Sequence, residues 1–573
     1  MKPNKAQQLL LDWCGYLLKQ QITDENDPYY GGFRCEACDR VHGRADNAVF
    51  PLICAYALTG EEQYLDGARR LLRFRRLLAH EDGSMQNDFD SEWKGITVFS
   101  ALNLSKTLSY FGEKLPANLR EELKQLFAAS AEWVYQNVKI GFRANINYYC
   151  AAAAVNAMAG AHFGSQACTE RAKELLAYGM AQFTDSGLIG GEGQPHGFRT
   201  EKGCAPVDVG YAMEESLPCL IDAAAALQDG AALDHLCRYA RRALDFLLPD
   251  GGWDNSFGVR NNKWTYYGSR TADGCLGAFA ALGKTDAAFT EAARRTVDLL
   301  RACTRDGALH GGLHYQEYGQ PPCVHHTFCH AAALADALCR GLTESNPTAL
   351  PCDEEASRVK YYPELDTYKL SVGPWLATVT AYDYITYTFP RGAAHASGGS
   401  LSLLYHRKRG AVIAGSVYEY KLTEPNNMQQ PKAVAHRSLI PRAEYEKDGV
   451  AYATCLDGNA AVEVTQERDS VRVSVRARFC DATERAVEDE LLAALFSYTF
   501  TADKVTITAK LNQKKDGVRF VLPIIKNTVT VTADAPHQCQ EIFFLTGGFG
   551  ADEYVLSLTE QEIQIEIGEK DHE

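Results

Sequence analysis

The chain has 573 residues, which is too long for one ordinary core and predicts two or more domains. Hydrophobic residues make up 46% of the chain, which is enough to fill large cores. The formal net charge of −15 argues against a general role at nucleic acid or at a membrane surface. A local basic cleft for an anionic ligand remains compatible with this charge.

The N-terminal segment, MKPNKAQQLLLDWCGYLLKQQ, has the pattern of an amphipathic helix. It has no continuous apolar region and no small-residue cleavage site, so we do not expect a signal peptide. No apolar run approaches the roughly 20 residues that cross a membrane. The 18 cysteines are scattered and lie mostly in apolar segments, which favours reduced thiols. We therefore expect a cytoplasmic protein.

Residues 1–345 show apolar positions at spacings of three and four, which predicts an array of helices. Polar loops return every few helices, as in an α/α toroid that carries an elaborated face at one end. We predict that residues 1–345 form an α/α toroid, an incomplete barrel, and that this is the catalytic domain. The predicted helices, after the N-terminal one, are 48–58, 63–79, 95–111, 119–138, 147–163, 167–183, 207–228, 231–248, 270–283, 286–303 and 324–342.

Residues 346–360 read as a linker, and the period then changes to two. Segments such as SLSLLYH, SVRVSVRARF and EIQIEIG alternate β-branched or aromatic residues with polar ones. The sequence TADK, between two such segments, is typical of a hairpin turn. We predict an antiparallel β-sandwich over 361–573.

The glycine-rich stretch 187–216, GLIGGEGQPHGFRTEKGCAPVDVGYAMEES, lies between two apolar helical segments. Long polar loops inside a compact domain are often functional. His196 and Arg199 lie in the loop, and Tyr211 and Glu215 follow on the next helix. We expect these side chains to face a cleft, although a buried, hydrogen-bonded tyrosine with two solvated carboxylates is an equally good interpretation of this segment alone.

The loop before the predicted helix at 147 contains Arg143, Asn145 and Asn147. A cation and two amides there are suited to binding a carboxylate and its neighbouring hydroxyls. Asn147 also suits the N-cap of the helix, which is the structural alternative. We expect this loop, the stretch 187–216 and the aromatic loop described next to converge on one cleft.

The aromatic loop combines side chains that stack on sugar rings with side chains that bind hydroxyls and carboxylates. The residues concerned are Trp253, Asp254, Trp264, Tyr267 and Arg270. Some of these aromatic residues must also pack the toroid. We predict that the loop contributes to substrate binding.

The spacing of Cys35, Cys38 and His42, CxxCxxxH, is compatible with a structural zinc ion, although no fourth ligand can be identified from the sequence. His325 and His326 open a later helix and are candidates for substrate binding. They lack the His-Glu-x-x-His pattern of a catalytic metal site. No cofactor is expected to be required for the chemistry.

Three stretches carry a resemblance to a known family: RANINYYCAAAAVNAMAGAHFG, GLIGGEGQPHGFR…VDVGYAMEESLP and AHASGGSLSLLYHRKRGAVIAGSVYEY. They resemble, in order, the asparagine-bearing helix, the segment with the catalytic tyrosine and the start of the sandwich in heparinase II/III-like polysaccharide lyases, which include oligoalginate lyases. The resemblance covers nearly the whole chain. It implies a catalytic role for Tyr211 and a cleft position for His395.

The first hypothesis is therefore a lyase that cleaves uronic-acid-containing oligosaccharides or polysaccharides by β-elimination. Such a reaction needs groups that offset the uronate charge, a base for the C5 proton and an acid for the leaving oxygen. Tyr211 is the candidate base or acid, with His196 or His395 as its partner. The candidates that offset the carboxylate are Asn145, Asn147, Arg199 and Arg270. In a cytoplasmic enzyme the substrate would be imported acidic oligosaccharide.

Two alternatives stay open. A glycoside hydrolase on the same toroid would need a pair of carboxylates across the scissile bond. The sequence offers many: Asp88, Asp90, Glu192, Asp208, Glu215 and Asp254. The second alternative is a glycan-binding protein without catalytic activity. The sequence gives no indication of oligomeric state.

Overall fold

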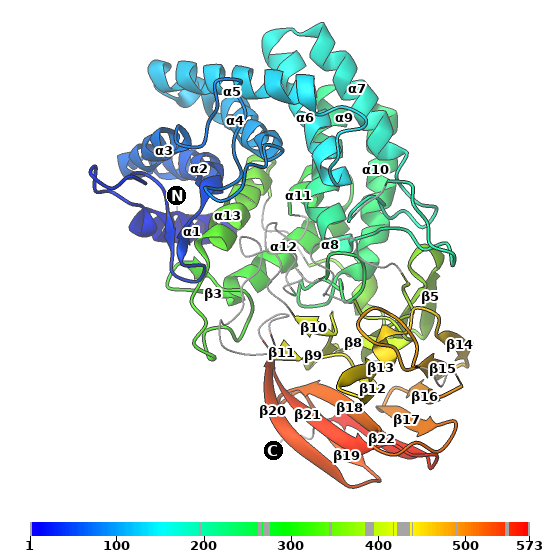
Figure 1. Cartoon of the computed structure of the whole chain (residues 1–573). Helices are drawn as coiled ribbons and strands as arrows, with labels where there is room; N and C mark the ends of the chain where they lie inside the picture. The colour runs from blue at the N-terminus through cyan, green and yellow to red at the C-terminus, as the bar shows by residue number, and fades with distance from the viewer. Residues whose placement is uncertain are drawn as a thin grey trace.

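The computed structural model describes residues 3–193, 196–261, 266, 276–342, 347–383, 395–415, 417–420, 436–437, 439–487, 491–544 and 549–570. Helices from the N-terminal part of the chain form one half of the molecule, and stacked β-sheets form the other half (Figure 1). This arrangement confirms the predicted order of a helical toroid followed by antiparallel sheets. No described helix is long and apolar enough to cross a membrane.

The helices lie close to the predicted ranges. They are α1 (Lys5–Gln20), α2 (Val49–Thr59), α3 (Glu62–Arg75), α4 (Thr97–Phe111), α5 (Ala117–Asn137), α6 (Ile146–Phe163), α7 (Gln166–Met180), α8 (Val209–Tyr211), α9 (Leu217–Ala226), α10 (Gly230–Ala243), α11 (Leu276–Leu282), α12 (Ala287–Ala302) and α13 (Val324–Cys339). Helix α1 packs against α13, so the first and last helices of the array meet.

Local sequence explains several helix ends. Asn4 caps α1 by accepting from the backbone N–H of Gln7, whose side chain in turn accepts from the backbone N–H of Asn4. Helix α2 ends at Gly60, whose φ of 75° is left-handed and suits glycine. Helix α6 is rich in alanine and buried along most of its length, because α4, α7 and α9 pack around it.

The larger strands form three antiparallel sheets. The first contains β5 (Arg358–Tyr362), β6 (Thr367–Val372), β7 (Trp375–Thr380), β8 (Ser400–His406) and β9 (Gly410–Ala414) in that order. The second has the order β14 (Ala461–Gln466), β15 (Val471–Arg478), β16 (Ala493–Phe500), β17 (Lys504–Leu511), β22 (Ile563–Glu569) and β19 (Val529–Ala533). The third has the order β13 (Val450–Ala453), β12 (Arg442–Lys447), β18 (Arg519–Ile525), β21 (Phe549–Ser557) and β20 (His537–Phe544).

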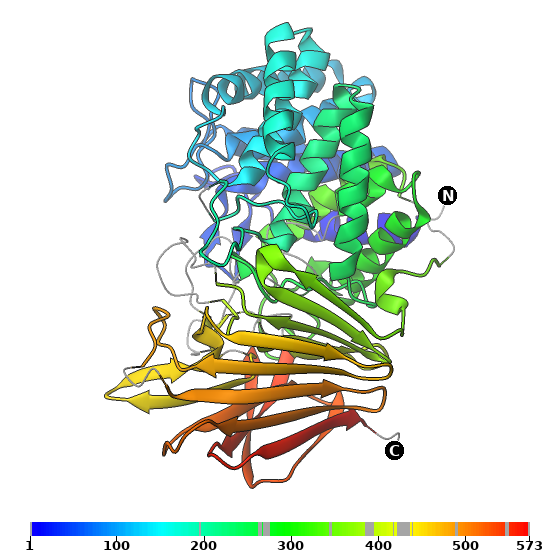
Figure 2. The same ribbon diagram turned by 90° about the vertical axis from the view of Figure 1, so that its right-hand side faces the viewer.

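The remaining strands are short pairs: β1 (Arg34–Cys35) with β2 (Arg40–Val41), β3 (Thr304–Arg305) with β4 (Ala308–Leu309), and β10 (Glu419–Tyr420) with β11 (His436–Arg437). The three larger sheets lie in layers beneath the helices (Figure 2) and share one hydrophobic core. Strand β15 alternates buried and exposed residues, as its sequence predicts. The TADK turn joins β16 to β17, with the Thr501 N–H donating to the Lys504 carbonyl at 3.0 Å.

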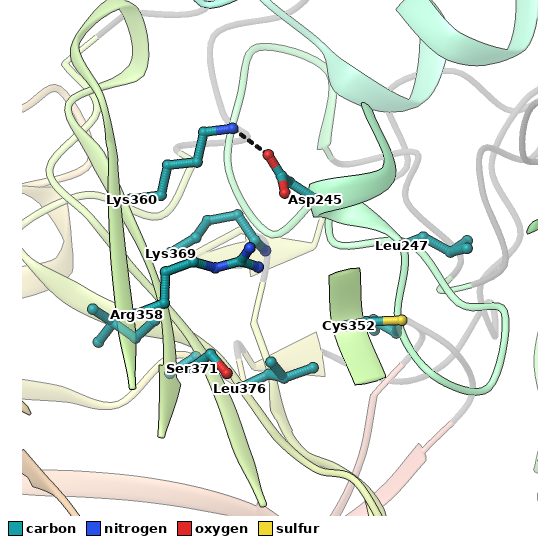
Figure 3. A pocket seen from close by; sticks show the side chains of 11 residues that line it. Asp245, Leu247, Cys352, Arg358, Lys360, Lys369, Ser371 and Leu376 are labelled. Carbon is teal, nitrogen blue, oxygen red and sulfur yellow. Dashed lines mark hydrogen bonds and ion pairs between the residues drawn. The ribbon is translucent and has the colours of Figure 1, made fainter. Parts of the chain in front are cut away.

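Charged contacts fasten the helical half to the first sheet. Asp245, just after α10, pairs with Lys360 of β5 at the edge of a small hollow between the two halves (Figure 3). Arg295 of α12 makes two parallel hydrogen bonds to Asp353, at 2.8 and 2.7 Å. Asp353 ends the short helix Pro351–Asp353 between α13 and β5. The segment predicted as a linker is therefore bound to helix α12 at Asp353.

Candidate active site

The site is centred on Tyr211, at the point where the glycine-rich stretch becomes helical. Asp208 caps α8, accepting from the Tyr211 N–H at 2.9 Å, and the Asn255 side chain donates to the same carboxylate oxygen at 3.1 Å. A π-helical turn, Ala212–Ser216, then separates α8 from α9. Such turns occur often at functional sites. The π turn interrupts the regular helix that the sequence predicts over 207–228.

A buried cation lies over the Tyr211 ring. The guanidinium carbon of Arg260 is 4.2 Å from the ring centroid. The Arg260 Nη1 donates to Glu192 Oε2 at 3.1 Å, and Glu192 is fully buried. Burial raises the pKa of Glu192 to about 7, and Asp208 and Glu215 add to this while Arg260 opposes it. The tyrosine, the cation and the carboxyl group therefore form one electrostatic unit.

An amide and a second carboxylate face each other beside this unit. Asn147 Nδ2 donates to Glu215 Oε2 at 2.5 Å. Asn147 lies in the first turn of α6, while Asn145 occupies the N-cap position and makes no side-chain capping bond. The backbone N–H of Ile146 donates to Gly191 O at 3.1 Å, which joins this loop to the glycine-rich stretch. The alternative role of Asn147 as N-cap is therefore wrong.

A second arginine, partly buried, approaches from the N-terminal part of the chain. Arg44 lies in the helical turn Gly43–Ala48. Desolvation disfavours its charged form, yet nearby groups, Cys329 first and then Tyr148, Glu215 and Tyr211, raise the pKa of Arg44 above its usual value. Tyr148 accepts a hydrogen bond from Trp93 Nε1 at 3.1 Å. Two arginines thus act on Tyr211.

Arg44 and Glu215 also line an open hollow among the helices. Glu214, Lys106 and Asp336 lie on its walls. The charges of both signs around it fit a polar ligand whose carboxylate and hydroxyls need specific partners.

The two candidate histidines lie in different settings. His196 is held by Tyr178, whose hydroxyl is 2.7 Å from its Nδ1, and its ring meets that of Tyr149 edge-on at 5.0 Å. His395 is buried, with its ring 4.9 Å from that of Tyr382. The Tyr382 hydroxyl donates to Ala205 O at 2.6 Å, so Tyr382 lies between His395 and the glycine-rich stretch.

The other predicted binding residues are spread more widely. Arg143 and Arg199 are exposed, and Arg199 donates to its neighbour's carbonyl, Phe198 O, at 2.9 Å. Trp253 is buried and stacks on Phe279 at 6.1 Å. Trp264, Tyr267 and Arg270 lie outside the described residues.

Asp254 has no exposed surface and pairs with Lys369 of β6, while the Thr378 hydroxyl also donates to it. His325 and His326 are buried in the first turn of α13. The ring of His325 lies 5.0 Å from that of His42. These positions place Asp254 at the junction of the two halves and His325 beside the predicted metal ligands.

The three predicted metal ligands do come together. Cys35, Cys38 and His42 offer ligand atoms that lie, with the sulfur of Cys323, within 4.8 Å of one another. Cys323 is the fourth partner that the sequence analysis lacks. It is 281 residues beyond His42, so no local spacing signal marks it.

Arg44 and Arg260 are the site residues that the sequence analysis missed. Arg260 is next to the asparagine pair at 261 and 262, inside the loop flagged for its aromatics. Arg44 follows the CxxCxxxH segment by two residues. Their proximity to Tyr211 arises only from tertiary packing.

The fold is an α/α toroid followed by antiparallel sheets, with a polar candidate site around Tyr211. Two family models match this chain: the ulvan lyase N-terminal domain matches residues 10–352 and the ulvan lyase C-terminal domain matches residues 359–542. The broad-specificity ulvan lyase of Formosa agariphila (strain DSM 15362 / KCTC 12365 / LMG 23005 / KMM 3901 / M-2Alg 35-1) is 35% identical over 535 residues, which cover 91% of this chain and 82% of that protein.

The chain belongs to the ulvan lyase family. It is a polysaccharide lyase, a carbon–oxygen lyase that acts on uronic-acid-containing glycans, as the first hypothesis predicted. The crystal structure of heparinase III has the same fold, with a TM-score of 0.56 and 11% identity over 100% of this chain and 86% of that one. The predicted resemblance to heparinase II/III-like lyases is thereby confirmed.

Proposed function

We propose that this enzyme cleaves ulvan or a closely related uronate polysaccharide by β-elimination at the Tyr211 centre. The observation that carries the assignment of the centre is the position of Arg260, 4.2 Å from the Tyr211 ring and paired with buried Glu192. Positive charge beside a phenol stabilises the phenolate, which is the form that accepts a proton. The ulvan part of the proposal rests on the name of the relative from Formosa agariphila.

In the proposed reaction, the uronate carboxylate binds where donors of positive or partial positive charge converge. Arg44 and Arg260 act on Tyr211, and the Asn147 amide donates to Glu215. Their charge offsets the negative charge that develops on the carboxylate as the C5–H bond breaks. Glu215 orients the Asn147 amide by accepting from its Nδ2.

Tyr211 then takes the C5 proton. The electron pair of the C5–H bond forms the C4–C5 double bond, and the C4–O bond breaks. The leaving oxygen needs a proton, for which we propose His395 as the donor, since its ring lies beside Tyr382, which contacts the stretch that leads to Tyr211. His196 is engaged by Tyr178, and we propose that it positions the loop instead.

The proposed chemistry uses side chains of this chain alone, without a required cofactor. A zinc ion at Cys35, Cys38 and His42 would have a structural role. Binding of nucleic acid or membranes is not part of the proposal, in keeping with the net charge of −15. Cytoplasmic action on imported oligosaccharides also stays a proposal, which fractionation of the source cells tests directly.

The substrate proposal is tested by incubating the purified enzyme with ulvan, heparan sulfate and alginate, each as polymer and as oligosaccharide. Elimination creates a conjugated unsaturated uronate, so ultraviolet absorbance reports each cut. We expect the largest kcat/KM with ulvan or its oligosaccharides. Equal or greater activity on alginate or heparan sulfate would refute the proposal that ulvan is the substrate. Release of reducing sugar without a rise in ultraviolet absorbance would refute the elimination mechanism.

A further inference from the structure

The N-terminal hairpin and the start of α13 bring three cysteines and one histidine to a single point. Cys35 lies on β1, Cys38 in the turn that follows, and His42 just after β2. Cys323 is the N-cap of α13. Cys35, His42 and Cys323 are buried, and Cys38 is half-buried. We propose that these four side chains bind one structural zinc ion that joins the two ends of the toroid.

The distances fit tetrahedral zinc. Cys323 Sγ is 3.8 Å from Cys35 Sγ and 3.6 Å from Cys38 Sγ. Zinc–sulfur bonds of about 2.3 Å at tetrahedral angles place two sulfurs about 3.8 Å apart. All four ligand atoms lie within 4.8 Å of one another. The side chains therefore already surround a point at which an ion satisfies each of them.

The donor set selects the metal and its role. Three thiolates and one imidazole are a known ligand set for structural zinc, and soft sulfur donors disfavour calcium and magnesium. Thiols alone explain the cluster poorly, because S–H groups are weak hydrogen-bond donors. Four protein ligands leave no open position for a water or a substrate, so the ion has no direct part in elimination.

The centre would close the toroid. Cys35 and Cys323 are separated by 288 positions, and α1 packs on α13 in the same region. Because ligands so far apart in the sequence come together only in the folded chain, the ion binds only the folded state, and its binding free energy adds to the stability of the fold. We therefore expect the ion to stabilise the whole helical half.

The same centre would hold one active-site arginine in place. Arg44 follows His42 by two residues, in the turn Gly43–Ala48. The Gly43 N–H donates to Asp88 Oδ1 at 3.1 Å, which fixes the chain between the ligand and the arginine. The His42 ring also contacts His325 of α13 at 5.0 Å. This coupling to catalysis rests on the proposed role of Arg44, whereas the zinc centre itself does not.

The direct test is the metal content of the full-length enzyme, purified without an added metal or a histidine tag. We expect about one zinc ion per chain by elemental analysis. Cys323→Ala should lose the ion, whereas Cys323→His, which offers a ligand again, should retain more of it. Cys237→Ser is the matched control, because this half-buried thiol of α10 lies outside the cluster, and it should keep the full content.

A measurement on the unmodified chain covers the case in which variants do not fold. Cobalt exchanged into the enzyme should give the visible absorption typical of tetrahedral thiolate sites. Strong chelators should lower Tm by at least about 5 °C and leave three more reactive thiols. Enzyme that holds no metal, has these thiols free and melts unchanged with a chelator would overturn the proposal. Zinc present with full activity in Arg44→Met would leave the zinc centre standing and overturn the role of Arg44.

Discussion

The guanidinium carbon of Arg260 lies 4.2 Å from the centroid of the Tyr211 ring, and its Nη1 donates to the buried carboxyl of Glu192 at 3.1 Å. A cation held between a phenol and a carboxyl couples the protonation of both groups. Asn147 and Glu215 stand beside this trio and complete a site with charges of both signs. The predictions below follow from these contacts.

The first prediction concerns Tyr211→Phe, which keeps the ring beneath Arg260 and removes only the hydroxyl. If the hydroxyl transfers the proton, turnover should fall by at least about a hundredfold, because acid–base groups typically contribute 10²- to 10⁴-fold. KM should change little, since the lost interaction belongs to the transition state. Steady-state kinetics on an unsaturated-product assay measures both constants.

Tyr452→Phe serves as the control for that substitution, because Tyr452 lies on β13, in the sheets. Its kinetics should match those of the unmodified enzyme. Near-normal turnover in Tyr211→Phe would move the base elsewhere, with His196 as the next candidate.

The second prediction concerns Asn147→Ala, which removes the amide that faces Glu215. Loss of one donor to the developing charge should lower kcat by about a hundredfold. The double variant with Tyr211→Phe should lose less than the product of the two single effects, because both groups act in one step. Asn156→Ala is the matched control, because Asn156 lies on the same helix and its side chain donates to the Ala152 carbonyl within that helix. Strict additivity would argue that Asn147 acts in a separate step.

The third prediction concerns pH and Glu192. Its folded pKa of about 7 lies above the ordinary value of 4.5, mainly because of burial. The folded state thus favours the proton, so this group stabilises the fold fully below about pH 4.5 and loses that contribution as pH rises through about 7. The loss amounts to at most about 3 kcal/mol.

Glu192→Gln should remove this dependence while keeping an acceptor for Arg260. We expect the free energy of unfolding of the variant to decline less between about pH 5 and pH 8 than that of the unmodified enzyme. Denaturant titrations at several pH values measure the difference. Parallel curves for the two proteins would show that Glu192 does not titrate in this window.

The fourth prediction concerns an ionic network at the wall of the hollow. Lys106 Nζ lies 2.7 Å from Asp336 and 3.2 Å from Asp222, and Arg340 Nε lies 3.1 Å from Asp336. Asp336→Ala leaves the buried Lys106 and the largely buried Arg340 with one fewer partner, and should lower the free energy of unfolding by about 3–5 kcal/mol. Chemical denaturation measures this loss.

Asp298→Ala is the surface counterpart of that change. Asp298 pairs with Arg294 at 2.7 Å, but its side chain is 39% exposed, so the effect should stay within about 1 kcal/mol. Equal losses for the two variants would contradict a special role for the buried network.

Sequence periodicity predicted most of the fold, because each helix or strand carries its own apolar pattern. The ranges expected for 147–163 and 324–342 differ by only a few residues from α6 and α13. The β-strands were predicted for the same reason, because a sheet with one buried face requires apolar and polar residues to alternate along each strand. The apolar pattern did not predict the π turn after Tyr211, because one such turn does not visibly change the spacing of apolar residues.

The candidate site was harder to predict from the sequence, because its contacts join distant parts of the chain. Tyr211 and Asn147 stood out through local composition and family resemblance, whereas Arg44 and Arg260 were indistinguishable from surface cations. Asp254 shows the converse. It stood among candidate sugar ligands in the sequence, yet it pairs with Lys369 across the junction of the two halves.

The most direct test of the central claim is the mass of the products formed from a defined uronate oligosaccharide of ulvan. Elimination adds no water, so the masses of the two products should sum to that of the substrate. The fragment from the reducing side of the cut should carry the unsaturated uronate at its new non-reducing end, and the other fragment should keep the glycosidic oxygen as a hydroxyl at its new reducing end. Tyr211→Phe should form these products at least about a hundredfold more slowly. Products whose masses sum to the substrate plus one water would contradict the account and show hydrolysis instead.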